Sequence, residues 1–180
     1  MLGGAVQLKQ HAIVLDTDDG AWQRLNQIPA EARRIDIWWF DDESSRLSLL
    51  LAHLMTRTEE WADARLQVIA PTSSEGEPKA ARSRLEKRLS DYRIDASIEA
   101  TPAPELADVV RLSRDAALVF LPLRIEGMQL QDPFGFGLQA TLTPLPLVAL
   151  VAACQDVRLS EERPEKEAPE TPEDEGRRAP

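Results

Sequence analysis

The sequence predicts an α/β fold with a mainly parallel sheet and helices on both faces. Short β-like runs alternate with helical patterns, and two of the runs, 117–121 (ALVFL) and 147–152 (LVALVA), are apolar throughout. Such runs are typical of parallel strands that are covered on both faces. Crossover helices connect parallel strands, and right-handed crossovers place helices on both sides of the sheet. Ligands of such sheets bind beyond the carboxyl ends of the strands.

The amino-terminal part of the chain contains three of the strand-like runs. A short helical pattern at Trp22, Leu25 and Ile28 follows the first run. A longer apolar stripe with helical spacing, at positions 47, 50, 51, 54 and 55, follows the second, and we expect Ser44 or Ser45 to cap this helix. The three predicted strands are 11–15 (HAIVL), 35–40 (IDIWWF) and 64–70 (ARLQVIA).

The second half continues the alternation. Ser74 and Glu77 have the spacing of a capping box, and Pro78 suits the first turn of the helix that follows. The segment 96–100 (ASIEA) alternates in polarity and is predicted as an edge strand, and Pro104 is expected to open another helix. The two apolar runs complete the predicted sheet.

Length and composition indicate one domain followed by a tail. The chain has 180 residues, 43% of them hydrophobic, which suits a single packed domain over residues 1–157. Residues 158–180 carry eight acidic residues, five basic residues and four prolines. A segment with so few apolar side chains cannot offset its ordering entropy, so we expect a disordered acidic, proline-rich tail.

Charge and cysteine content exclude several classes of function. The net charge of −10 argues against nucleic-acid binding and against electrostatic docking on anionic lipid. Cys154 is the single cysteine, which excludes an internal disulfide and a cysteine-rich zinc site and fits a reducing, cytoplasmic compartment. No run approaches the ~20 apolar residues of a membrane span, so we expect no direct membrane insertion by this chain.

Two groups of carboxylates follow predicted strand ends. Asp16 and Asp18 follow the first run, and this Asp-x-Asp pattern resembles the first motif of haloacid-dehalogenase phosphotransferases, in which one Asp is the nucleophile beside magnesium. Asp41 and Asp42 follow the second run. If both strand ends lie at one edge, these carboxylates could form a metal or ligand edge. The alternative, which we favour, is that they cap helices, and we predict no catalytic residue, metal or cofactor.

Aromatic side chains provide the candidate interface. Trp38 and Trp39 are neighbours on one strand and must point to opposite faces of the sheet, where they belong either to the core or to an interface. Together with Phe40 they form the first group of candidate anchors. Phe134 and Phe136 lie in a glycine-containing segment, and no basic residue that could hold a phosphate lies between Arg124 and Arg158. We therefore favour either a flexible loop or partner docking through these two phenylalanines.

The segment 34–70 resembles the cytosolic C-terminal domain of cation-chloride cotransporters, which belong to the amino acid–polyamine–organocation superfamily. The matching features are the IDIWW strand, an acidic turn, a Leu-rich helix, Trp61 and a basic-apolar strand. The helix 77–92 with its RIDA continuation and the DAALVFL segment extend the resemblance to Leu121. It therefore covers about half of the chain.

This resemblance implies a universal-stress-protein-like three-layer sandwich. It also implies a non-enzymatic regulatory and dimerisation domain at the inner face of the membrane, attached to the transmembrane domain of the same transporter and forming a homodimer. Two alternatives from other classes remain. One is a stand-alone universal-stress-like protein that binds a nucleotide, and the other is a magnesium-dependent phosphotransferase that uses Asp16 and Asp18.

Overall fold

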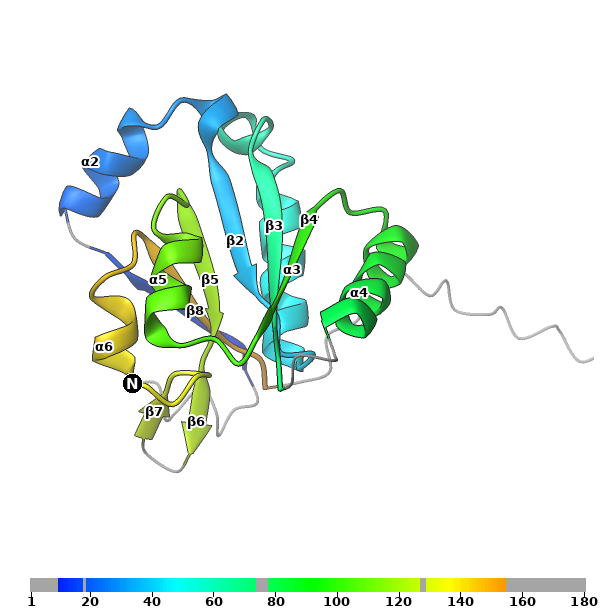
Figure 1. The fold of residues 1–180 in the computed structure, drawn as a ribbon. Coiled ribbons are helices and arrows are strands. Elements are labelled where there is room, and N and C mark those ends of the chain that lie inside the picture. The colour runs from blue at the N-terminus through cyan, green and yellow to red at the C-terminus, as the bar shows by residue number, and fades with distance from the viewer. Residues whose placement is uncertain (1–9, 18, 74–77, 127–128, 155–180) are drawn as a thin grey trace, which may run out of the picture.

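The fold is a central sheet between two layers of helices (Figure 1). The computed structural model describes residues 10–17, 19–73, 78–126 and 129–154. The strands are β1 (Ala12–Asp16), β2 (Arg34–Trp38), β3 (Arg65–Thr72), β4 (Ser97–Pro102), β5 (Leu118–Pro122), β6 (Arg124–Glu126), β7 (Gln129–Gln131) and β8 (Val148–Ala152). The helices are α2 (Asp19–Gln27), α3 (Glu43–Met55), α4 (Pro78–Tyr92), α5 (Leu106–Ser113) and α6 (Leu138–Leu142), with 3-10 turns at Ala30–Ala32 and Glu59–Trp61.

The main sheet has six strands in the order β1-β8-β5-β2-β3-β4. All neighbouring pairs are parallel except β1 and β8, which run antiparallel. The mainly parallel sheet is therefore confirmed, and β4 lies at an edge as its alternating sequence predicted. The antiparallel direction of β1 has a further consequence, because it places Asp16 beside Val148 at the beginning of β8.

Two apolar cores lie on the two faces of the sheet, because neighbouring side chains on a strand alternate. On one face, Ile37 and Trp39 pack with buried residues of α2, α3 and α4. On the other face, Trp38 and Leu121 pack with buried residues of α5 and α6. The prediction that helices cover both faces, and that the two tryptophans point to opposite sides, is confirmed.

The starts of the helices follow from their first residues. Asp42, and not Ser44 or Ser45, caps α3: its Oδ1 accepts a hydrogen bond from the Ser45 amide at 2.8 Å. The serine prediction was wrong by two to three positions, because the carboxylate that ends the preceding turn already occupies the capping site. Within the described residues, α4 begins at Pro78.

Several predictions lie outside the described residues, and several elements were not predicted. The capping pair Ser74–Glu77 and the tail 158–180 lie outside the described residues. The elements that were not predicted are the hairpin of β6 and β7 and the short helix α6. None of the described helices combines the length and the apolar character that a membrane crossing requires.

Candidate functional site

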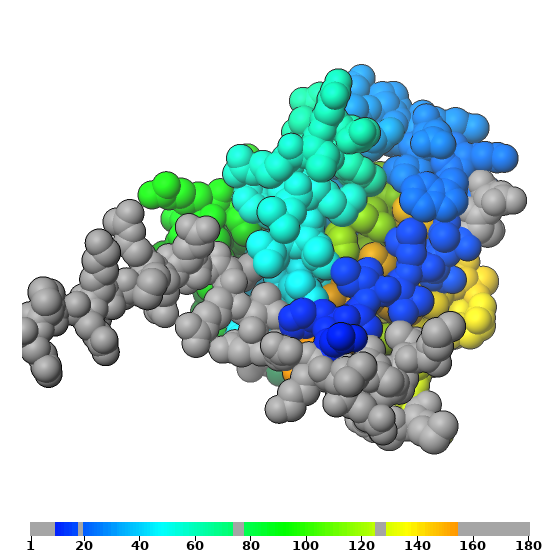
Figure 2. Space-filling view, turned by 180° about the vertical axis from the view of Figure 1, so that it is seen from behind, coloured from blue at the N-terminus to red at the C-terminus, as the bar shows by residue number. Residues whose placement is uncertain are grey.

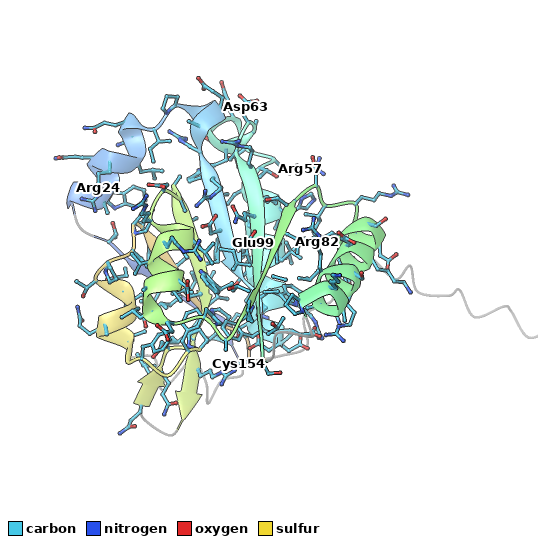
Figure 3. All side chains as sticks on the ribbon, in the orientation of Figure 1. Arg24, Arg57, Asp63, Arg82, Glu99 and Cys154 are labelled. Atoms are coloured by element: carbon cyan, nitrogen blue, oxygen red, sulfur yellow. The ribbon has the colours of Figure 1, made fainter. Side chains whose placement is uncertain are left out.

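The carboxyl edge of the parallel strands brings most of the predicted interface residues together. Phe40 follows the end of β2, and Phe134 and Phe136 come from the loop that follows β7. The ring centroids of Phe134 lie 4.9 Å from Trp38, 5.4 Å from Phe40 and 5.7 Å from Phe136. We call Phe40, Phe134 and Phe136 the aromatic cluster. Figure 3 places Cys154 at this carboxyl edge and Arg57 and Asp63 at the opposite, amino edge.

The five predicted anchors differ in how far solvent reaches them. Trp38 is fully buried, and its Nε1 donates a hydrogen bond to Ser113 Oγ at 3.1 Å. Trp39 is also buried, beneath the guanidinium of Arg88 at 5.8 Å from its ring centroid. By contrast, Phe136 is 37% exposed. The two tryptophans therefore support the site from within, and the aromatic cluster forms its accessible part. An interface role for any of them stays a prediction.

A buried carboxylate, which the sequence did not indicate, holds the loop that carries Phe134 and Phe136. Asp132 is 4% exposed, and its two oxygens accept hydrogen bonds from four successive backbone amides, those of residues 134–137, at 2.8–3.3 Å. Gly135 and Gly137 have φ values of 83° and 92°, which favour glycine. The sequence signal that was available is the pattern D-P-F-G-F-G, an aspartate before a turn with two glycines.

This use of Asp132 decides what the loop can bind. Successive amides in such a turn form a concave nest that attracts anions. Here the chain's own carboxylate already occupies these four donors. The loop is therefore a preformed support for aromatic side chains, and a phosphate group would have to displace Asp132 to use the same amides.

An open groove of about 390 Å³ lies beside the aromatic cluster. A second pocket of about 300 Å³, which also contacts Phe40, is lined by Arg84, Arg88 and Asp41 as well as by apolar groups. The groove is mostly apolar and is lined by Phe40, Pro71, Thr72, Ser73, Ala103, Pro104, Pro133, Phe134 and Phe136. An apolar groove with a charged neighbour suits the docking of a protein segment more than the positioning of a reacting group.

Asp41 and Asp42 serve the structure around the end of β2. Asp41 adopts a left-handed conformation with φ of 57° and forms an ion pair with Arg88, whose Nη1 lies 2.7 Å from Oδ1. Asp42 caps α3 and also accepts a hydrogen bond from the Ser45 hydroxyl at 2.7 Å. The capping interpretation is therefore confirmed for Asp42, and Asp41 is balanced by a cation.

The shared carboxylate edge does not form. Asp16 lies opposite Val148, near the amino ends of the parallel strands, whereas Asp41 and Asp42 follow the carboxyl end of β2. The condition of one common edge is not met, because β1 runs antiparallel to β8 and its end points the other way. Asp18 lies outside the described residues, and within the described part of the chain no three His, Cys, Asp or Glu residues are placed to hold a metal ion.

A buried ion pair anchors β2 against α5. Asp36 is fully buried, and its two oxygens accept hydrogen bonds from Arg34 at 2.7 and 3.1 Å. Burial raises the pKa of Asp36, against the opposing effect of the Arg34 guanidinium. Arg34 also donates to the carbonyl of Leu112 in α5 at 2.8 Å. The pair therefore links the strand to the helix and leaves no charge free for chemistry.

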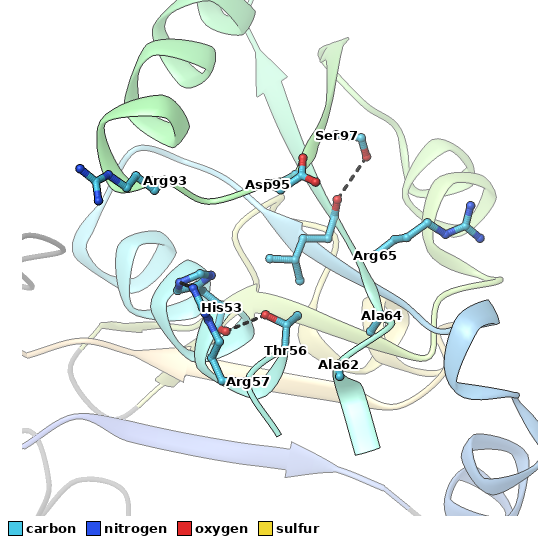
Figure 4. Close-up of a pocket in the computed structure, with 11 residues that line it drawn as sticks. His53, Thr56, Arg57, Ala62, Ala64, Arg65, Arg93, Asp95 and Ser97 are labelled. Atoms are coloured by element: carbon cyan, nitrogen blue, oxygen red, sulfur yellow. Dashed lines mark hydrogen bonds between the residues drawn. The ribbon is translucent and has the colours of Figure 1, made fainter. Parts of the chain in front are cut away.

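The amino edge carries an open pocket of about 490 Å³ (Figure 4). Three arginines, His53 and Asp95 line it. In the close-up, Arg65 and Arg93 point away from each other on opposite sides of the cavity. Desolvation, together with the charge of Arg57, lowers the pKa of His53 and favours its neutral form. Because the polar groups do not converge on one point, the arrangement does not define a catalytic or ligand site.

Comparison with known proteins supports the resemblance seen in the sequence. No curated protein matches the chain. The family model described as Solute carrier family 12 matches residues 21–99, a segment that begins in α2 and ends in β4. Trp38, Trp39 and Phe40 lie inside this segment, and the loop of Phe134 and Phe136 lies outside it. Over residues 21–99 the chain is thus similar to solute carrier family 12, the cation-chloride cotransporters.

Proposed function

We propose that this chain is a non-enzymatic cytosolic regulatory and dimerisation domain of a cation-chloride-cotransporter-like secondary transporter. The proposal places the domain at the inner face of the membrane, attached to the transmembrane domain of the same transporter. The membrane part moves the ions, and the α/β domain responds to or transmits a signal. A universal-stress-protein-like arrangement of the sheet is part of this proposal.

The observation that carries the proposal is the extent of the match to solute carrier family 12. Residues 21–99 include β2, α3, β3 and α4 in full, together with the beginning of β4. In the fold these elements are neighbours: β2, β3 and β4 are adjacent strands, and α3 and α4 pack on the same face. The similarity therefore covers a contiguous structural unit and not a scattered motif.

The aromatic cluster is the surface that we assign to contact with the transmembrane domain. Its groove is apolar, and its loop is held by Asp132 before any partner arrives. A preformed apolar surface loses little conformational freedom on binding, which favours a stable contact. Arg124 lies 5.9 Å from the ring of Phe40 and adds a positive group beside the cluster.

Ion flux tests the proposal. In the source cells, the coding sequence for this domain is deleted in frame and chloride-dependent uptake of a cation tracer is measured, with re-expression of the intact sequence as the control. We expect a changed rate of uptake that the intact sequence restores. Uptake that is unchanged by the deletion would contradict a role in transport regulation.

A second measurement addresses the aromatic cluster alone. Phe136→Ala in the full protein should alter uptake while the domain keeps its thermal stability, because this side chain is already 37% exposed. Asp115→Ala, at a side chain that is 74% exposed and lies outside the surfaces proposed for binding, is the control and should leave uptake unchanged. Equal effects of the two substitutions would remove the assignment of this surface.

A further inference from the structure

The two edges of the main sheet differ in how they are protected. An open edge strand offers unpaired backbone groups to another chain, and proteins block such edges with charges and prolines. The edge strand β4 contains both, Glu99 and Pro102, and Glu99 is marked on β4 in Figure 3. The other edge strand, β1, has the sequence AIVLD and lacks both protections along its first four residues. Among the described strands, only β8 pairs with β1.

Two large apolar side chains of β1 are also exposed. Ile13 is 53% exposed and Leu15 is 41% exposed. Their partners in β8, Val151 and Ala149, belong to the core beneath α3, so both side chains point to the α3 face of the sheet. Figure 2 shows β1, α2 and α3 on one side of the molecule, with a hollow between them.

We propose that β1 pairs with β1 of a second copy of this chain, antiparallel and in a register centred on Val14. A twofold axis perpendicular to the sheet at this edge aligns β1 antiparallel to its own copy and keeps the α3 faces of both sheets on one side. In this register Ile13 of each copy lies opposite Leu15 of the other copy. Each copy therefore completes the apolar row of its partner, and the two six-stranded sheets become continuous.

The charges in this register are compatible with pairing. Asp16, the only charged residue in β1, lies opposite Ala12 of the partner copy and not opposite its own equivalent. Like charges directly opposite each other destabilise a strand pair, and this register avoids them. A register shifted by two residues would place either Ile13 or Leu15 opposite the same residue of the partner copy. The contacts between Ile13 and Leu15 would then be lost.

The exposed apolar area is close to what a dimer needs. Trp22 in α2 and Leu54 in α3, two helices on the same side of the molecule as β1 in Figure 2, are 43% and 53% exposed. Because a large aromatic side chain buries roughly 150–250 Å² and a large aliphatic one less, these two and the two β1 residues, each about half exposed, offer on the order of 300 Å² per copy. A standard interface buries about 800 Å² per partner, of which somewhat more than half is apolar. A second copy is therefore an occupant of suitable size.

This inference rests on the proposed function, because it names the surface through which the domain dimerises. The purified 180-residue chain is measured by sedimentation equilibrium, and we expect a species of twice the 20.1 kDa chain mass. Leu15→Arg should weaken the self-association at least tenfold. Phe136→Arg, which adds the same charge at an exposed apolar residue of the aromatic cluster, should leave the dimer intact. A wild-type chain that remains monomeric at 100 µM would overturn the inference.

The register is tested by crosslinking in a Cys154→Ser background. Val14→Cys places two thiols opposite each other across the twofold axis, within the Cα separation of about 4.4–6.8 Å that a disulfide requires. We expect mild oxidation to convert this variant to a covalent dimer, and the Ala12→Cys variant to remain uncrosslinked. A dimer that resists Leu15→Arg and does not crosslink at position 14 would also overturn the inference. A monomer would leave the flux result untouched, whereas unchanged flux with an intact dimer would contradict only the proposed function.

Discussion

Removal of the Asp132 carboxylate should release the loop that carries Phe134 and Phe136. In Asp132→Ala, four backbone amides lose their acceptor, and the side chain that is lost is only 4% exposed. Hydrogen bonds to charged groups contribute roughly 1.5–3 kcal/mol each. Because all four share one carboxylate, their contributions do not add, and we expect a total loss of about 2–4 kcal/mol. In a domain of this size that loss lowers the melting temperature by roughly 5–15 °C.

The assay is thermal and urea unfolding followed by circular dichroism and by tryptophan fluorescence. Trp38, one of the four tryptophans of the chain, lies at the site, because its ring centroid is 4.9 Å from that of Phe134. Asp115→Ala is the matched control, since Asp115 is 74% exposed and its ion pair with Arg114 lies on the surface. We expect this control within about 0.5 kcal/mol of the wild type. An Asp132→Ala variant that unfolds within about 1 °C of the control would contradict the role assigned to Asp132 in holding the loop.

Three further substitutions test the packing around the site. Trp38→Phe removes the hydrogen bond to Ser113 and part of a fully buried ring, so urea unfolding should show a loss of about 1–3 kcal/mol, and a loss below about 0.5 kcal/mol would contradict the buried placement. Asp42→Ala removes the cap of α3 and should cost about 1 kcal/mol in the same assay, with restoration by Asp42→Ser. Asp36→Asn should change the pH dependence of stability. Because burial raises the folded pKa of Asp36, its ionisation reduces stability as pH rises above about 4 through that pKa. The free energy of unfolding of the wild type minus that of Asp36→Asn should therefore decrease with rising pH, and an increase would contradict the assigned direction.

The order of strands and helices could be predicted because it depends on local pattern. The stripe of α3 and the apolar runs of β5 and β8 are signals within single elements. The alternation at Trp38 and Trp39 then placed the two rings on opposite faces. These features need only the geometry of a strand or a helix, which the sequence specifies directly.

The direction of β1 and the role of Asp132 could not be predicted for a common reason. Whether β1 runs parallel or antiparallel depends on which strand it meets, and that partner, β8, lies at the other end of the chain. The possibility that Asp16 shares an edge with Asp41 and Asp42 failed for this reason. Similarly, Asp132 gains its role only when the loop folds back on it, within a segment where the sequence drew attention to its glycines and phenylalanines.

The residues of the candidate site could be predicted from the sequence, but their solvent exposure could not. The five aromatic residues were selected because of their type and their neighbours, and the structure brings Trp38, Phe40, Phe134 and Phe136 into one cluster of rings. Their exposure depends on packing of α5 and of the loop, which no local pattern specifies. Trp38 is therefore a buried support, whereas Phe136 is the exposed member.

The central claim is that this chain belongs to a transporter, and the mass and location of the native protein test it most directly. Source cells are separated into membrane and soluble fractions, and both are probed with an antibody raised against this domain. The account predicts a band in the membrane fraction that is much larger than the 20.1 kDa of this chain. A soluble band near 20.1 kDa, with none in the membrane fraction, would contradict it.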